Sequence, residues 1–270
     1  MDDHEQREAR RRANWCQTPA TRIPDPDAAA ALIDRVGLAT LFAASPEVPN
    51  LFHAYMGDPQ ATTDSKWDSP AGEVYSWRWA LGRREAAFYT ALVRGKPTWV
   101  SWKLLPAVLR LKGAAGDAEG LYRAGQLSEN AHRIAQALNA ADGVLETGAL
   151  RKAAGFPTGT QQRAAYLKAV EELEGYMLLA KLFSPDDDDM RHGLVRRCYP
   201  AHAAQADALT PEAAMDQLLA SYLLAAVYAE PKVLARHLRL DAAALRAGLD
   251  RLVAAGRAGV DEGLFVSDER

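Results

Sequence analysis

The chain has 270 residues, of which 49% are hydrophobic, 25% charged and 8% aromatic, and these fractions are ordinary for a globular protein. They exclude a disordered tail, a collagen-like polymer and a disulfide scaffold, the last because Cys16 and Cys198 are the only cysteines. The formal net charge of −3 excludes a molecule that binds polyanions over its whole surface, but not one with a local basic patch.

The sequence predicts a cytoplasmic protein without a membrane partner. No apolar run approaches the ~18–20 residues that cross a bilayer. The segment from Met1 to Arg7 has no apolar core of a secretory signal. Residues 1–26 are expected to form an N-terminal extension, either a solvated helix with alternating charge or a basic arm.

A first unit is predicted at residues 27–112. Helices are expected after Asp27, at 46–56 and at 83–93, and a short strand at 98–102. Tyr75, Trp77 and Trp79 form a period-2 row, which favours an extended segment with one aromatic face.

A second unit is predicted at residues 117–200, after a weakly packing stretch at 112–116. Ser128 begins the first of three helices, and a hairpin with strands near 178–183 and 193–199 follows. Three helices followed by a hairpin form the winged-helix plan. The run from Asp186 to Asp189 is interpreted as a solvated wing tip rather than a cation site.

A third unit, residues 208–267, repeats this order of elements. Thr210 and Asp241 are expected helix N-caps, and residues 258–266 a small hairpin. The predicted fold class is therefore mainly α with short β-hairpins, arranged as three tandem winged-helix units.

Cations and tryptophans are concentrated in the first unit. Residues 72–112 hold eight Lys or Arg and two acidic residues, and all six tryptophans lie in the first 102 residues. Cations neutralise phosphates and aromatic rings stack on unpaired bases. The predicted DNA-binding residues are Arg78, Arg83, Arg84, Arg94, Lys96, Lys103, Arg110 and Lys112, with Arg236, Arg239 and Arg246 in the third unit. The predicted base-stacking residues are Trp77, Trp79 and Trp99. The alternative is that the tryptophans form core and the cations a solvated rim.

Other chemistry is not indicated. The sequence lacks phosphate-loop, dinucleotide-binding, zinc-protease and nucleophile-elbow motifs, and its six histidines have no metal-ligand spacing. We expect neither a metal nor another cofactor.

Several stretches resemble the AlkZ-like family of winged-helix proteins, which contains bacterial DNA glycosylases that release bulky alkylated bases and unhook interstrand crosslinks. The middle of that family is matched by Leu121–Ser128, Ala131–Ile134, Leu150–Gly155 and Leu167–Leu173. Trp77–Trp79 and Gly95–Ser101 resemble a branch described only as AlkZ-related. The resemblance covers roughly residues 27–258 and implies three tandem winged helices around a concave DNA-binding face.

One departure concerns catalysis. Glycosylases of this family carry a Gln-x-Gln signature after the first helix, where this chain reads Gly37-Leu38-Ala39-Thr40-Leu41. Base excision needs polar groups that position water or stabilise the sugar cation, and Ala39 and Leu41 supply none. Whether the chain is an enzyme is left open.

The resemblance predicts a protein that binds damaged or distorted duplex DNA in bacterial DNA repair or damage response. The alternatives are a glycosylase with other catalytic residues and a non-catalytic protein-interaction scaffold. The sequence does not indicate an oligomeric state.

Overall fold

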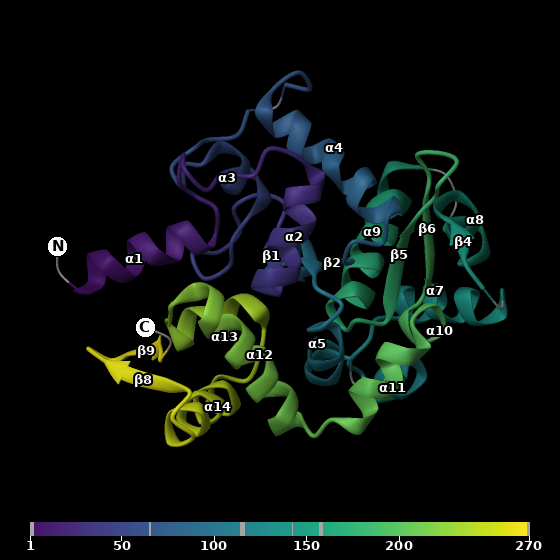
Figure 1. Cartoon of the computed structure of the whole chain (residues 1–270). Coiled ribbons are helices and arrows are strands. Elements are labelled where there is room, and N and C mark those ends of the chain that lie inside the picture. The colour runs from purple at the N-terminus through teal and green to yellow at the C-terminus, as the bar shows by residue number, and fades with distance from the viewer. Residues whose placement is uncertain (1–2, 65, 114–116, 142, 157–158, 269–270) are drawn as a thin grey trace.

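A computed structural model describes residues 3–64, 66–113, 117–141, 143–156 and 159–268. Helices predominate, and the strands form three separate three-stranded antiparallel sheets, one in each predicted unit (Figure 1). Within the described ranges, no helix is long and apolar enough to cross a membrane.

The N-terminal part of the chain builds the first sheet and the helices around it. Its elements are α1 (Asp3–Asn14), α2 (Pro26–Val36), β1 (Leu38–Thr40), α3 (Leu51–Met56), α4 (Pro70–Arg83), β2 (Phe88–Val93), β3 (Lys96–Val100) and α5 (Leu105–Lys112). The strand order is β1-β3-β2, and the central β3 pairs Val100 with both Leu38 and Phe88. A tight turn at Arg94-Gly95 joins β2 to β3.

The middle part carries its own hydrophobic core. Its elements are α6 (Ala118–Arg123), α7 (Glu129–Ala140), β4 (Leu145–Glu146), α8 (Thr147–Ala153), α9 (Thr160–Gly175), β5 (Leu179–Phe183), β6 (Met190–Leu194), α10 (Val195–Cys198) and α11 (Pro200–Ala208). Ile134, Leu138, Tyr166 and Leu173 pack together in a cluster separate from the rest of the molecule's core.

The C-terminal part shares its core with the N-terminal part. It contains α12 (Pro211–Ala226), β7 (Tyr228–Ala229), α13 (Pro231–Leu238), α14 (Ala242–Ala254), β8 (Ala258–Asp261) and β9 (Leu264–Ser267). Leu218 and Leu219 of α12 belong to the same buried cluster as Trp77 and Trp99. Figure 1 shows α12 crossing the molecule beside α5 and α2, so that the two ends of the chain form one body.

Short polar side chains begin the helices, as the sequence predicts. The side chains of Ser128, Thr210 and Asp241 each accept a hydrogen bond from the backbone N–H three residues later. At α2, however, Asp25 is the cap and Asp27 lies in the first turn. The predicted caps Ser128, Thr210 and Asp241 are therefore confirmed, whereas α2 begins earlier than expected.

Two predictions in the N-terminal part are wrong, and a third is right only for the second half of the expected helix. Tyr75–Trp79 is helical and not extended, because Ser69 caps α4 and Val74, Trp77 and Leu81 place a buried stripe at helical spacing. The expected helix at 83–93 is mostly strand β2, whose residues hydrogen-bond to β3. The expected helix at 46–56 begins only at Leu51, after the Asn50 cap.

In the middle part, the returning strand ends at Leu194, and residues 195–198 form α10 in place of continued strand. The predicted linker between 112 and 116 lies largely outside the described residues, since 114–116 are not among them.

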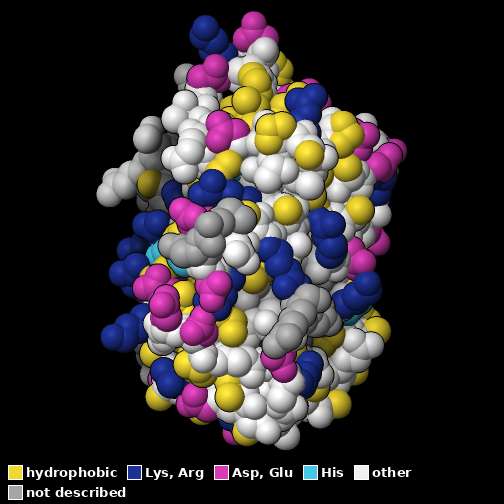
Figure 2. All heavy atoms as spheres, turned by 60° about the vertical axis from the view of Figure 1, so that its left-hand side comes forward, with side chains coloured by type: hydrophobic (Ala, Val, Ile, Leu, Met, Phe, Trp, Pro, Cys, Tyr) yellow, Lys and Arg dark blue, Asp and Glu magenta, His cyan; other side chains and the backbone are white. Residues whose placement is uncertain are grey.

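Basic and acidic side chains are interspersed over the face shown in Figure 2, so no extended area of one charge covers it. On this face, positive charge is therefore confined to small clusters of side chains.

Candidate nucleic-acid interface

Two of the three predicted base-stacking tryptophans lie in the core. Trp77 is 1% exposed, and its indole N–H donates to Glu73 Oε1 at 2.9 Å. Trp99 is 0% exposed on β3, with its ring centroid 4.7 Å from that of Tyr89. Burial leaves neither ring a face for a base, so the prediction for Trp77 and Trp99 is corrected.

Trp79 is half-buried at the contact between α4 and β5. Its ring meets Phe183 edge to face at 5.3 Å, and the guanidinium groups of Arg78 and Arg83 lie 5.4 and 5.3 Å from its centre. Trp79 therefore keeps an exposed edge but is committed to packing between two parts of the chain.

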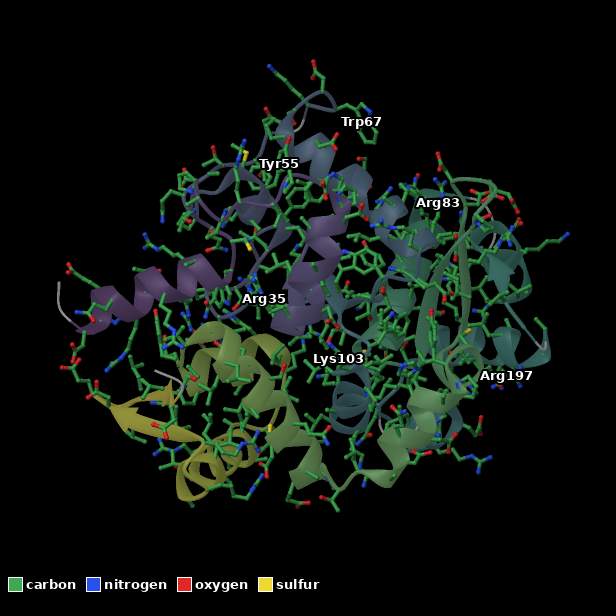
Figure 3. All side chains as sticks on the ribbon, viewed as in Figure 1. Arg35, Tyr55, Trp67, Arg83, Lys103 and Arg197 are labelled. Atoms are coloured by element: carbon green, nitrogen blue, oxygen red, sulfur yellow. The ribbon has the colours of Figure 1, made fainter. Side chains whose placement is uncertain are left out.

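Several predicted DNA-binding cations are paired with carboxylates and lie apart from one another. Arg83 donates to Asp188 in the acidic turn at 2.6 Å, Arg84 pairs with Asp27, and Lys103 with Asp34 at 2.6 Å. In Figure 3, Arg83 lies at the end of α4 beside the β5–β6 hairpin, whereas Lys103 lies near the middle of the molecule. These three residues do not form one surface.

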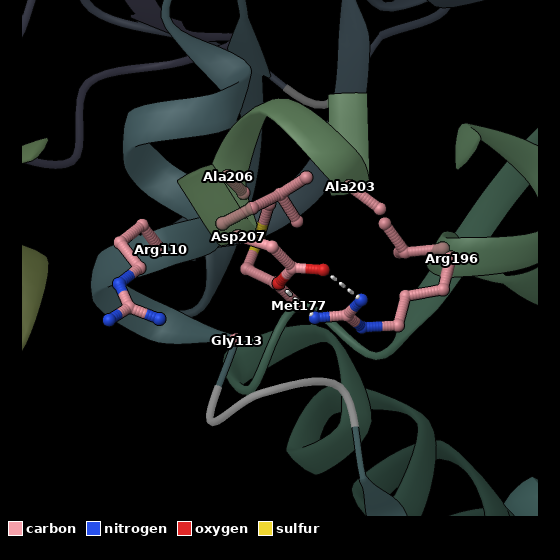
Figure 4. A pocket seen from close by; sticks show the side chains of 9 residues that line it. Arg110, Gly113, Met177, Arg196, Ala203, Ala206 and Asp207 are labelled. Atoms are coloured by element: carbon pink, nitrogen blue, oxygen red, sulfur yellow. Dashed lines mark hydrogen bonds and ion pairs between the residues drawn. The ribbon is translucent and has the colours of Figure 1, made fainter. Parts of the chain in front are cut away.

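Two further predicted cations also lie elsewhere. Arg246 pairs with Asp250 on α14 and covers Phe265 at 4.6 Å. Arg110 lines a small pocket of about 30 Å³, on whose other side Arg196 and Asp207 form a two-bond ion pair (Figure 4). That ion pair lowers the pKa of Asp207. Its opposite charges neutralise each other, which leaves the pocket without a free acid.

The structure does bring together five of the predicted residues. We name this group the basic junction: Arg94, Lys96, Lys112, Arg236 and Arg239. It forms where the β2–β3 turn meets the C-terminal end of α13. The backbone N–H of Arg94 donates to His237 O at 3.0 Å.

Lys112 hydrogen-bonds to the two backbone carbonyls that follow His237 at the C-terminal end of α13. Its Nζ donates to Leu238 O at 3.1 Å and to Arg239 O at 3.0 Å. Burial, reinforced by the charge of Arg239, lowers the pKa of Lys112 to about 8. Carbonyls at a helix C-terminus have no partner within the helix, so these bonds help to hold together segments 126 and 127 residues apart.

The basic junction contains one neighbouring carboxylate. Glu171 of α9 lies close to Gly95, whose φ of +72° makes the tight turn that brings the hairpin against α13. Lys96 and Arg239 are exposed and pair with no carboxylate in the part of the chain that the structure describes. The junction therefore keeps a net positive charge.

A cavity of about 670 Å³ opens beside the basic junction. Its walls come from α1, the loop after β1, α3, the loop at 59–60, the β2–β3 turn and β7. Arg94 belongs to both the cavity wall and the junction. The lining residues are His4, Glu8, Arg11, Arg12, Trp15, Gln17, Ala43–Pro46, Val48, Asn50, His53, Pro59, Gln60, Arg94 and Tyr228.

Carboxamide and aromatic groups dominate the polar lining. Gln17 is 6% exposed, and its carboxamide has no hydrogen-bond partner among the described residues. The buried Trp15 Nε1 likewise has none in the described ranges. Donors and acceptors left open beside apolar walls are the features of a ligand site.

His53 is not available for proton transfer. Its Nδ1 lies 3.0 Å from Asn50 Nδ2 and its Nε2 lies 3.1 Å from Ala61 O. An amide nitrogen only donates and a carbonyl only accepts, so Nδ1 accepts, Nε2 carries the proton and the ring is neutral. Burial accordingly lowers the pKa of His53.

A buried polar network closes the floor of the cavity. Arg11 of α1 donates to Tyr228 O at 2.6 Å and Ala226 O at 2.8 Å, and pairs with Glu47 at 3.4 Å. Glu47 also accepts from the Tyr222 hydroxyl and from Glu230 N. The pKa of Arg11 is raised by its neighbours, above all Tyr222 and Glu47, although burial opposes this. The expected helix is therefore present in α1, but it is not wholly solvated, because Arg11 is buried against the C-terminal part of the chain.

The segment that would carry the glycosylase signature is sealed in the core. Ala39 and Leu41 are buried on and beside β1, and the Thr40 hydroxyl donates to Pro49 O at 3.4 Å. None of the three side chains lines the cavity.

Sequence reasoning missed the cavity and its polar lining. Arg11 and Tyr228 are 217 residues apart, and Gln17, Ser45 and His53 stand in no motif. No local signal could have found them, because tertiary packing alone brings them together.

Comparison with known proteins identifies the family of this chain. The family described as AlkZ related matches residues 23–239. Streptomyces sahachiroi DNA glycosylase AlkZ has a similar structure, with a TM-score of 0.58 and 15% identity over 97% of this chain and 70% of that chain. No match is found among curated proteins. Since the family match spans most of the chain, including the β1 segment, the cavity loop and the basic junction, this protein belongs to the AlkZ-related family.

Proposed function

We propose that this protein binds damaged or distorted duplex DNA in DNA repair or damage response, and that its three sheet-containing parts act as tandem winged-helix units. The observation that carries the proposal is the continuity of the cavity with the basic junction through Arg94. Membership of the AlkZ-related family and the structural likeness to a DNA glycosylase support DNA as the ligand.

The basic junction supplies contacts to the backbone of DNA. Lys96, Arg236 and Arg239 are exposed. Cations that neutralise phosphates bind all sequences alike and release counterions, so such binding weakens steeply with salt. We therefore propose that the junction fixes the position of the duplex without reading its sequence.

The cavity supplies the preference for distorted DNA. Its volume lies within the range of about 300–1,000 Å³ that is usual for small-ligand sites. A base leaves the stack more readily at a mismatch or lesion than in perfect duplex. The open carboxamide of Gln17 can then bind its polar edge.

The titratable groups of the cavity favour binding over base excision. Glu8 is bound by Arg12 and the Tyr228 hydroxyl, each at 2.8 Å, and its pKa is lowered by these bonds although burial opposes them. Glu47 is held in the buried network, and both ring nitrogens of His53 are engaged. A general base needs a free acceptor within reach of its substrate.

Paired charge-removal variants test the proposal. Lys96→Gln/Arg239→Gln removes two junction cations, and Arg84→Gln/Lys103→Gln removes the same charge from residues paired with carboxylates elsewhere. Fluorescence anisotropy would be measured on perfect, mismatched and alkylated duplexes between 50 and 200 mM salt, a range in which about four phosphate contacts give a log–log slope near −3.6.

The junction variant is expected to weaken binding of every duplex and to reduce the salt slope by about two. The control should change binding little. Equal effects of both variants, or absence of DNA binding, would contradict the proposal and favour a protein-interaction scaffold. Release of an alkylated base by the purified protein would favour a glycosylase that uses other residues.

A further inference from the structure

At the mouth of the cavity, the loop after β1 meets α13 through a serine and a histidine. Ser45 Oγ lies 2.8 Å from His237 Nδ1. On the other side of the ring, Arg236 Nη2 lies 3.4 Å from His237 Nε2. The Arg94 guanidinium lies next to Ser45, since its Nη1 donates to Ala44 O at 3.1 Å. Four polar side chains from three elements thus converge.

The hydrogen-bond directions at this point follow from chemistry. A guanidinium only donates, so His237 Nε2 must accept from Arg236 and the ring proton must be on Nδ1. His237 therefore donates to Ser45 Oγ. The same oxygen also accepts from the backbone N–H of Glu47 at 3.0 Å. Both acceptor positions of Ser45 are filled, and its hydroxyl proton has no partner within the described residues.

Every group that remains open at this point is a donor. The Ser45 hydroxyl and the outer N–H groups of Arg94 and Arg236 face outward without an acceptor side chain in the described part of the chain. The nearest carboxylate in sequence, Glu47, is 2% exposed and is already bound by Arg11 and Tyr222. Donors that converge without a competing acceptor form a favourable site for an oxyanion.

We propose that Ser45, Arg94 and Arg236 form an oxyanion seat that binds one phosphate group at the mouth of the cavity, with His237 orienting Ser45 and Arg236 through its two ring nitrogens. The assignment of this phosphate to a nucleic acid rests on the proposed function. A phosphate held here would place the adjoining nucleotide at the cavity, because Ser45 and Arg94 line both. The seat would thus set the register between the duplex backbone and the base that leaves the stack.

The titration of the His237 ring should report whether a phosphate is bound at the oxyanion seat. Burial, with the charges of Arg236 on α13 and Arg94 on the β2–β3 turn, lowers its pKa, and Glu47 on the loop opposes them. A bound phosphate adds negative charge beside the ring, which favours the imidazolium form. Binding should therefore raise the pH at which His237 titrates.

The test follows the His237 ring by NMR from pH 5 to 8, assigned with His237→Gln. Four samples are compared: no ligand, inorganic phosphate, a dinucleoside monophosphate and a mismatched duplex. Phosphodiesters do not titrate in this range, so a shift in their presence belongs to the protein. With an occupied seat, the midpoint is expected to rise by about one pH unit.

Ser45→Ala and Arg236→Gln are expected to weaken binding of the dinucleoside monophosphate roughly tenfold and to reduce the shift. Arg246→Gln, which removes an equal charge from the same part of the chain, is the control. Thermal melting verifies that each variant folds.

The outcomes separate the seat from the proposed function. A His237 shift with inorganic phosphate but not with duplex would support the seat and contradict DNA binding. The seat would be overturned if Ser45→Ala and Arg236→Gln left duplex binding unchanged and the His237 titration did not shift in any sample. That result would leave the proposed function intact.

Discussion

Arg11 stands in a run of arginines and glutamates that predicts a solvated helix, yet its side chain is buried. It lies 3.7 Å from the centre of the Tyr228 ring and donates to the carbonyls of Ala226 at the end of α12 and of Tyr228 in β7. A buried charge is costly unless it is paired, and Glu47 supplies the pairing. Sequence cannot distinguish this arginine from Arg10 or Arg12, because the distinction arises from partners more than 200 residues away.

Replacement of Arg11 by methionine is expected to lower the free energy of unfolding by about 3–5 kcal/mol, since Glu47 is left buried without its cation. Arg12→Met is the matched control, because Arg12 pairs with Glu8 on the exposed side of the same helix and should cost less than about 1 kcal/mol. Urea denaturation measures both. Equal losses would contradict the role of the buried pair.

His192 is a second residue whose burial has a measurable consequence. It is 3% exposed on β6, its Nε2 lies 3.1 Å from the Thr147 hydroxyl, and burial lowers its pKa to about 4. Between pH 6.5 and 4, the unfolded chain takes up a proton here that the folded protein does not. The free energy of unfolding should therefore fall as pH falls through this range, by about 3 kcal/mol in all.

His192→Phe should remove most of this dependence. Urea titrations of both proteins at pH 5 and pH 7 provide the measurement. An identical loss of stability on acidification in the two proteins would show that other groups cause it.

At the scale of elements, the sequence predicts best where capping and periodicity agree. Ser128, Thr210 and Asp241 each precede an apolar helical stripe, and all three helices are present. Prediction fails at α4, because aromatic residues at alternate positions resemble a strand while the stripe of Val74, Trp77 and Leu81 is helical. The base-stacking prediction for Trp77 and Trp99 fails as well, because composition alone does not distinguish a buried ring from an exposed one.

At Gly82, helix α4 packs closely against Phe183 in the middle part of the chain. A Cβ atom at this position would lie 2.1 Å from the Phe183 ring, which is itself packed against Trp79 and Trp99. Gly82→Ala should therefore cost about 1–3 kcal/mol, although alanine favours helix.

Gly148→Ala in α8 is the control, since a Cβ atom there would meet nothing within 4 Å and should stabilise slightly. Thermal melting of both variants tests the contact. Stabilisation by Gly82→Ala would mean that Phe183 moves aside without cost.

At the scale of the whole molecule, the three units that follow one another along the chain do not each have a hydrophobic core of their own. The middle part packs its own cluster, whereas α12 packs into the core of the N-terminal part. The three sheets agree with the predicted repeat of helices followed by a hairpin. That repeat does not predict that the N-terminal and C-terminal parts share one hydrophobic core. Periodicity shows which face of α12 is apolar and not which partner covers it. The cavity and the basic junction exist because these two ends meet.

Truncation after Ala208 should therefore unfold the N-terminal sheet, because α5 and α2 lose α12. Hydrogen exchange followed by mass spectrometry should show loss of protection in β1–β3 while α7 and α9 remain protected. Retained protection in β1–β3 would mean that the N-terminal part folds without α12.

The contacts of α1 also bear on how the chain folds as it is synthesised. Arg11 emerges from the ribosome early, but the carbonyls that it binds belong to residues 215 and 217 positions later. At about 5–20 residues per second, this separation corresponds to roughly 10–40 seconds. During that interval α1 lacks the two carbonyls on which it docks, so the floor of the cavity cannot close until residues 226–228 have been synthesised.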